Sequence, residues 1–192
     1  MSASHINRDD SLWVAPDLTE EILGRHLDRD FRVFPMAENN ALADDVVALA
    51  DRFGVNFPRE FYGHVCGRFP GIFVEVIEEV WPRPKVFDVG PFWSFLYGLH
   101  TFTPCSDSED WMRLDYVTYR FQESTGHKAA PILQIVGDAD LFCVTSEGAI
   151  ARYRHETNEL EQETLGFWGI FEREVRELKD RKDRKDRKVA GI

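Results

Sequence analysis

Residues 131–156, PILQIVGDADLFCVTSEGAIARYRHE, decide the fold class. They hold three short runs rich in β-branched and aromatic residues, at 131–137, 140–146 and 148–156, which is the pattern of strands. The last two runs are separated by Ser-Glu-Gly, residues 146–148, which favours a tight turn. The second half of the chain is therefore predicted to contain a β-meander.

Helical patterns flank this meander. Apolar residues recur at intervals of three or four, the spacing that places them on one face of a helix. The helices are expected within residues 17–27, 41–54, 56–71, 105–126 and 163–180. The last of these is expected to bury Phe167 or Trp168, Phe171, Val175 and Leu178. The first is expected to be a short surface helix.

Short polar residues and glycines predict the ends of these helices. The expected N-caps are Thr19, Asn39 or Asn40, Asn56 and Ser106, the last in a capping box with Glu109, and the expected C-terminal glycines are Gly54 and Gly126. Two more strands are expected at residues 72–80 and 84–89, because both runs are β-branched and bounded by prolines or glycine.

Residues 88–104, DVGPFWSFLYGLHTFTP, combine seven aromatic or leucine side chains with prolines and glycines. Strand-like pieces are expected here, interrupted at Pro91, Gly98 and Pro104. Trp and Tyr are common anchors of protein interfaces, but aromatic residues beside Pro and Gly also fill cores beneath irregular loops. The segment is thus either a binding site or part of the core.

The charge of the chain limits the classes of partner that it is expected to bind. The net charge is −11, but residues 179–192 hold 7 basic and 3 acidic residues, which leaves 16 basic and 31 acidic residues, a charge of −15, in residues 1–178. Such a field repels nucleic acid and anionic membranes and attracts basic partners, although solubility alone also explains it. The terminal repeat KDRKDRKDRK predicts a solvated helix or a frayed tail, because its aspartates dilute the positive field.

The sequence disfavours several other classes of protein. No apolar run reaches the roughly 18 to 20 residues that span a bilayer, and the polar start lacks the features of a signal peptide, so a cytoplasmic location is expected. The three cysteines and six histidines are scattered without metal-ligand spacing, so no metal, cofactor or disulfide is expected. A thiol hydrolase that uses Cys105, His100 and Asp88 is a weak alternative, because no second catalytic motif supports it. By elimination the chain is predicted to be a binding protein and not an enzyme.

Several motifs resemble those of the SUKH superfamily, which includes fungal regulators of cell-wall glucan synthesis and many bacterial proteins. The similar region covers roughly residues 40–178. Its motifs are a hydrophobic residue, proline and aromatic residue that open a helix, a Gly-Asp before a strand, a hairpin glycine, and a late helix with spaced phenylalanines. In this chain they are Phe57, Pro58, Phe61, Gly137, Asp138, Gly148, Phe167 and Phe171. Residues 81–104 are interpreted as the hallmark of a narrower branch.

The resemblance implies an α+β fold, with a central, mainly antiparallel sheet flanked by helices in a single domain. It places that domain at residues 38–178, after an N-terminal extension with a short helix at 1–37 and before a charged C-terminal tail at 179–192.

The resemblance also implies a function. Bacterial members are often immunity proteins that neutralise a cognate toxin, frequently a nuclease, and an acidic inhibitor complements a basic nuclease. We therefore expect a basic toxin domain as the partner, with a regulatory scaffold in cell-wall synthesis as the alternative. The expected contacts combine aromatic anchors with acids: Trp81, Asp88, Trp93, Tyr97, Asp107, Glu109 and Asp110.

Overall fold

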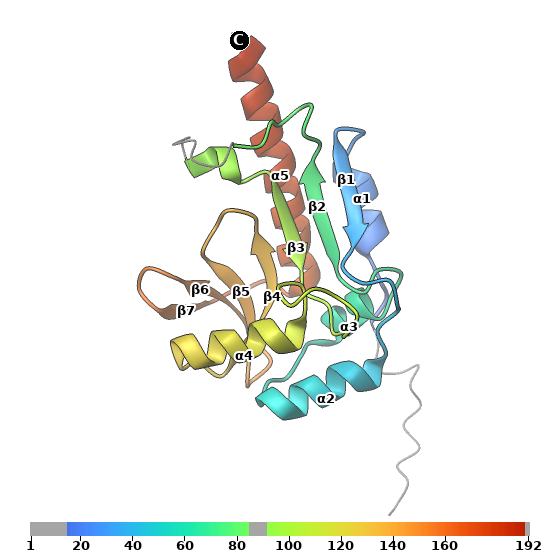
Figure 1. Ribbon diagram of the computed structural model, residues 1–192, viewed down its shortest axis with the longest axis vertical. Coiled ribbons are helices and arrows are strands. Elements are labelled where there is room, and N and C mark those ends of the chain that lie inside the picture. The colour runs from blue at the N-terminus through green and yellow to red at the C-terminus, as the bar shows by residue number, and fades with distance from the viewer. Residues whose placement is uncertain (1–14, 85–91, 191–192) are drawn as a thin grey trace, which may run out of the picture.

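A seven-stranded antiparallel sheet organises the computed structural model, which describes residues 15–84 and 92–190, with backbone alone for 92–93 and 186–190 (Figure 1). Each strand pairs with the next one in sequence, so the strand order is β1 to β7. The strands are β1 (Phe31–Pro35), β2 (Ile72–Val76), β3 (Gly98–Thr101), β4 (Ala129–Ile135), β5 (Leu141–Thr145), β6 (Ile150–Arg154) and β7 (Glu159–Gln162). The helices are α1 (Thr19–His26), α2 (Ala43–Phe53), α3 (Arg59–Val65), η2 (Phe92–Phe95, a 3₁₀ turn), α4 (Leu114–Thr125) and α5 (Phe167–Ala190). The predicted α+β fold is confirmed.

The predicted meander is present as β4, β5 and β6. Gly148 takes a φ of +82° in the turn between β5 and β6, a conformation that glycine adopts without strain. Pro131, which lacks a backbone N–H, pairs with Cys143 directly before the point where the register between β4 and β5 shifts, and irregular points of this kind are where sheets accommodate proline.

The two edge strands were not predicted. β1 pairs with β2, and β7 pairs with β6. The residues of β7 are Glu-Leu-Glu-Gln, which offer one apolar side chain, and β1 is only five residues long and ends in proline. Such short edge strands are held in the sheet by backbone pairing with a neighbouring strand, and their sequences show little of the alternating apolar pattern by which strands are predicted.

The glycine ends of two helices are confirmed, but the predicted N-caps are wrong. Gly54 and Gly126 end α2 and α4 in the left-handed region, with φ values of +64° and +77°. The residues at the N-cap positions are Leu18, Leu42, Pro58 and Arg113, none of which caps with its side chain. At α1 it is Asp17 that accepts a hydrogen bond from the backbone N–H of Thr19, 2.9 Å away.

Helix α4 begins eight residues later than its predicted cap at Ser106. The backbone of Thr103 explains the difference, because its N–H donates to Met112 (2.9 Å) and its C=O accepts from Leu114 (2.7 Å). This nonlocal pairing holds residues 104–113 in a looped conformation on the surface, and the helix starts only after it.

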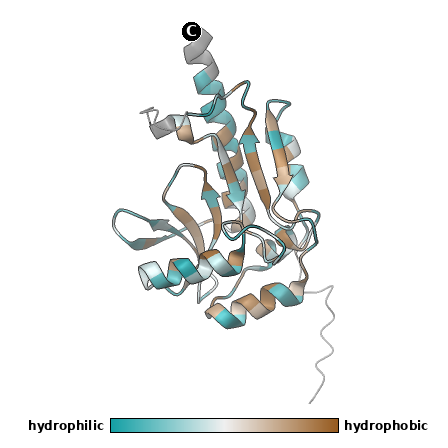
Figure 2. Ribbon diagram, in the orientation of Figure 1, coloured by the Kyte–Doolittle hydropathy of each residue, from teal (hydrophilic) through white to brown (hydrophobic). Residues whose placement is uncertain are grey.

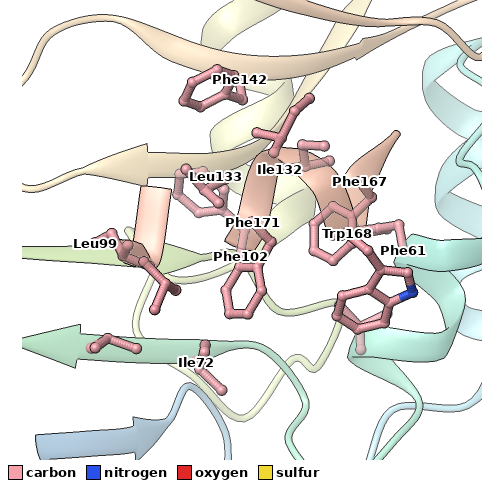
Figure 3. Packing of buried hydrophobic residues seen from close by; sticks show 14 of the residues in the cluster. Phe61, Ile72, Leu99, Phe102, Ile132, Leu133, Phe142, Phe167, Trp168 and Phe171 are labelled. Atoms are coloured by element: carbon pink, nitrogen blue, oxygen red, sulfur yellow. The ribbon is translucent and has the colours of Figure 1, made fainter. Parts of the chain in front are cut away.

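The main core lies between the sheet and α5, which runs behind the strands in Figure 1. All the residues predicted for the inner face of this helix are buried: Phe167, Trp168, Phe171, Val175 and Leu178. The ring centroids of Phe61 and Phe167 are 5.5 Å apart, edge to face, which is a favourable geometry for aromatic pairs. Figure 3 shows these rings beside residues from β2, β3 and β4. On the other side of the sheet, α4 covers a smaller cluster of Phe121, Ala129, Cys143 and Tyr153.

The charged repeat after Leu178 continues α5 as a helix. The ammonium group of Lys179 lies 3.0 Å from the carboxylate of Asp28 and 2.8 Å from that of Asp183. Lys182 is only 6% exposed, and its side chain pairs with Asp30. The contacts with Asp28 and Asp30 attach the repeat to the turn between α1 and β1.

A candidate protein-binding face

Four aromatic side chains at the surface, those of Phe34, Phe73, Trp111 and Tyr116, form what we call the aromatic face, in which Phe73 is only partly exposed. Phe34 and Phe73 are directly opposite each other on β1 and β2. The ring of Phe73 contacts Trp111 edge to face, with centroids 6.4 Å apart. The exposed fractions of Phe34, Trp111 and Tyr116 are 43%, 47% and 40%, which is high for such large side chains.

The arrangement of the sheet explains this exposure. Side chains alternate between the two faces of a strand, so Phe34 and Phe73 point away from the core that α5 covers. Among the described residues, α4 packs against β4 on this outer side, and no helix lies in front of β1 and β2 in the view of Figures 1 and 2. Among the described residues, no helix therefore covers the outer sides of β1 and β2.

An acidic groove borders the aromatic face. It has a volume of about 810 Å³ between the chain after β1 and the loop before α4. Its lining includes Glu38, Asp107, Glu109, Asp110, Trp111 and Tyr116, and no Lys or Arg is among the described residues that line it. The groove thus suits a cationic side chain, which can form charge-assisted hydrogen bonds with the four carboxylates and cation–π contacts with the two exposed aromatic rings.

Hydrogen bonds hold the acidic groove in shape. Asp107 accepts two bonds from Asn39, from the side-chain amide at 2.6 Å and from the backbone N–H at 3.3 Å. The hydroxyl of Ser108 donates to the carbonyl of Met36, 2.6 Å away. These bonds tie the loop before α4 to the chain after β1, so the two walls of the groove are fixed relative to each other.

His100 supports the aromatic face from below. Its ring is 6% exposed, stacks on Phe73 with centroids 5.8 Å apart, and meets Trp111 edge to face at 5.6 Å. Burial lowers the pKa of His100 to about 4, so the ring is neutral at pH 7. Its buried Nδ1 atom has no hydrogen-bond partner among the described residues. The ring thus acts as a flat, largely apolar support for Trp111 and Phe73.

The structure separates the residues that were expected to form one contact surface. Asp107, Glu109 and Asp110 are exposed and lie together in the acidic groove. Trp81 is only 2% exposed, and its indole N–H donates to the carbonyl of Ser94, 2.9 Å away, so its expected place on the surface is wrong.

Of the remaining expected contacts, Tyr97 is not among the residues that line the acidic groove. Tyr97 is half-buried under the guanidinium of Arg83, which lies 3.7 Å from its ring centroid. Trp93 is described only by its backbone in η2, and Asp88 lies outside the described residues.

The aromatic residues of the face were missed for identifiable reasons. Trp111 lies within residues 105–126, which were expected to form a helix with one apolar face, but the helix starts at Leu114 and Trp111 belongs to the loop before it. Phe34 belongs to a strand that was not predicted. Phe73 was correctly placed on a strand, but a single strand does not show which of its sides lacks a covering helix.

Comparison with known proteins finds no matching family model, curated protein or solved structure. The SUKH resemblance therefore stays a prediction, and the fold is of the class that it implies.

The geometry gives the thiol alternative no support. Cys105 donates its S–H to the carbonyl of Asn39, and burial raises the pKa of its thiol, which opposes formation of the nucleophilic thiolate. The ring contacts of His100 are with Phe73, Phe102 and Trp111.

In residues 15–84 and 92–190, no three His, Cys, Asp or Glu side chains are placed to hold a metal ion. None of the helices in the same residues has the length and apolar character of a membrane span.

Proposed function

We propose that this protein binds and neutralises a basic, nuclease-like protein toxin, and that the partner docks on the aromatic face and the adjoining acidic groove. The observation that carries the proposal is the position of Trp111, which is 47% exposed and lines a groove with four carboxylates. A Trp side chain at the centre of an exposed patch is a common energetic anchor of protein interfaces.

Charge supports a basic partner. Residues 1–178 carry a net charge of −15, and the groove concentrates negative charge beside the exposed rings. Opposite charges on two surfaces accelerate their encounter and disfavour acidic competitors. A nuclease domain is commonly basic where it contacts phosphates, so it presents the complementary surface.

The resemblance to SUKH immunity proteins supports the same function. A protein of this kind needs a rigid surface and no catalytic residues of its own. The acidic groove fits that need, because its walls are held together by the bonds of Asp107 and Ser108.

Affinity capture from a lysate of the source cells tests the proposal. The tagged protein is compared with a variant in which Glu38, Glu109 and Asp110 are changed to Lys, leaving Asp107 to hold Asn39. The matched control changes Glu78, Glu79 and Glu147 to Lys, three exposed acids outside the groove, and so makes the same change in net charge.

We expect one dominant basic partner that is retained by the wild type and the control at low salt, and is lost from the groove variant. Several partners from one pathway would instead favour a regulatory scaffold. A partner that binds the groove variant as well as the wild type would contradict the proposed surface.

A further inference from the structure

A second groove lies beside the acidic groove, between α4 and the outer side of β4 to β6. We call it the α4 groove. It has a volume of about 540 Å³, and its lining includes Trp111, Tyr116, Val117, Phe121, Leu141 and Tyr153. The chemistry of its walls differs from that of the acidic groove. Among the described residues that line it, only Arg120 belongs to the types Asp, Glu, Lys and Arg.

The floor of the α4 groove is rigid and apolar. Phe121 on α4 and Tyr153 on β6 are 5% and 6% exposed, and their rings meet edge to face with centroids 5.0 Å apart. Leu141 packs against the same small cluster and is only partly buried. An apolar side chain that enters this groove would be removed from water against a surface that needs no rearrangement.

The two grooves share a wall, because Trp111 and Tyr116 line both of them. These two rings therefore form a ridge with carboxylates on one side and apolar side chains on the other. In an extended segment, side chains two positions apart project on the same side, about 7 Å from each other. A partner segment that crosses the ridge can thus place one side chain in each groove.

We propose that the partner presents a Lys or Arg close to a large apolar residue, with the cationic side chain in the acidic groove and the apolar side chain in the α4 groove. This inference rests on the proposed function and specifies the chemistry of the epitope. Charge complementarity selects the cation on one side of the ridge, and the apolar and aromatic side chains that line the α4 groove select the apolar residue on the other.

A phage-displayed library of random 12-residue peptides, selected on the full-length protein, tests the inference. We expect the enriched peptides to pair Lys or Arg with Leu, Phe or Trp within four residues. The best peptide is then synthesised with a fluorescent label, and its affinity is measured at low and high salt.

Neutral substitutions separate the two grooves. Ser124→Gln with Ala139→Gln narrows the α4 groove without changing the net charge, and Ser146→Gln is the control at an exposed position elsewhere. We expect the double variant to weaken peptide binding about tenfold while the salt dependence stays the same. The triple acidic-groove variant should weaken binding and also flatten its salt dependence.

Two failures are distinguishable. Enriched peptides that are basic but lack an apolar residue, or whose binding is unaffected by Ser124→Gln with Ala139→Gln, would overturn the two-part epitope and leave the proposed function standing. Acidic or purely apolar peptides, or no enrichment, would overturn the inference, and acidic peptides would contradict the basic partner as well.

Discussion

The Nε2 atom of His64 on α3 lies 2.7 Å from the hydroxyl of Thr101 on β3, in the interior of the protein. The other ring nitrogen, Nδ1, lies 2.8 Å from the hydroxyl of Thr19 on α1. A neutral ring satisfies both hydroxyls, since it donates one hydrogen bond and accepts the other. His64 therefore joins two helices to the sheet in a buried polar network.

The neutrality of His64 and His100 makes the protein sensitive to acid. Burial lowers the pKa of each ring to about 4, from about 6.5 in the unfolded chain. As the pH falls from 6.5 to 4, His64 and His100 bind protons in the unfolded state but stay neutral in the folded state. Each ring should thus remove up to about 3 kcal/mol of stability over this range, and the full stability is present only above pH 6.5.

The substitution His100→Phe tests this account. It keeps a ring on Phe73 and removes both the titrating group and the unpaired Nδ1. In urea unfolding at pH 7, 6 and 5, the variant should lose roughly half as much stability on acidification as the wild type. Parallel pH profiles for the two proteins would show that His100 does not contribute.

Gly137 should tolerate substitution less well than Gly126, although both have a positive φ. A Cβ atom on Gly137 would lie 2.7 Å from the Cβ of Phe95, whereas one on Gly126 would have nothing within 4 Å. Gly126→Ala should therefore cost only the strain of the left-handed backbone, about 1 kcal/mol, and Gly137→Ala roughly 2 kcal/mol more. Equal midpoints of chemical unfolding for the two variants would contradict the contact with η2.

Lys182 should stabilise the attachment of the terminal helix. The residue is 6% exposed and pairs with Asp30, whereas Arg184, two positions later, is exposed. Lys182→Ala should lower the free energy of unfolding by about 2 kcal/mol. It removes the ion pair with Asp30 and the buried aliphatic part of the lysine side chain. Arg184→Ala should change it by less than about 0.5 kcal/mol. Thermal or urea unfolding compares the two, and similar losses would argue against the packed repeat.

Trp111 should matter for binding more than an equally exposed aromatic residue outside the face. Tyr119 is 50% exposed and does not line either groove, which makes it the matched control for Trp111. Trp111→Ala should weaken binding of the captured partner by about thirtyfold or more, and Tyr119→Ala by less than about twofold. Calorimetric titration measures both, and an equal effect would exclude Trp111 as an anchor.

The sequence predicts the parts of the fold that have long or strongly patterned segments. The apolar spacing from Phe167 to Leu178 continues for more than three turns, and this helix is buried as predicted. The predicted cap of α4 was wrong because the backbone bonds of Thr103 with Met112 and Leu114 determine where this helix starts. The edge strands β1 and β7 were missed because pairing with a neighbour, and not their own pattern, holds them in the sheet.

The candidate site was only partly predictable for a related reason. Charged side chains are seldom buried, so the exposure of Asp107, Glu109 and Asp110 followed from their type alone. The exposure of an aromatic side chain depends instead on which elements cover it. Trp81 is covered and Trp111 is not.

The most direct test of the central claim is the association rate constant of the captured partner, measured by stopped-flow fluorescence at low and high salt. For the wild type and for the Glu78, Glu79 and Glu147 control, we predict fast association that slows at least about tenfold as salt rises. For the variant with Lys at positions 38, 109 and 110, we predict slow association that hardly changes with salt. The same rate constant and salt dependence in all three proteins would contradict the claim that the acidic groove receives a basic partner.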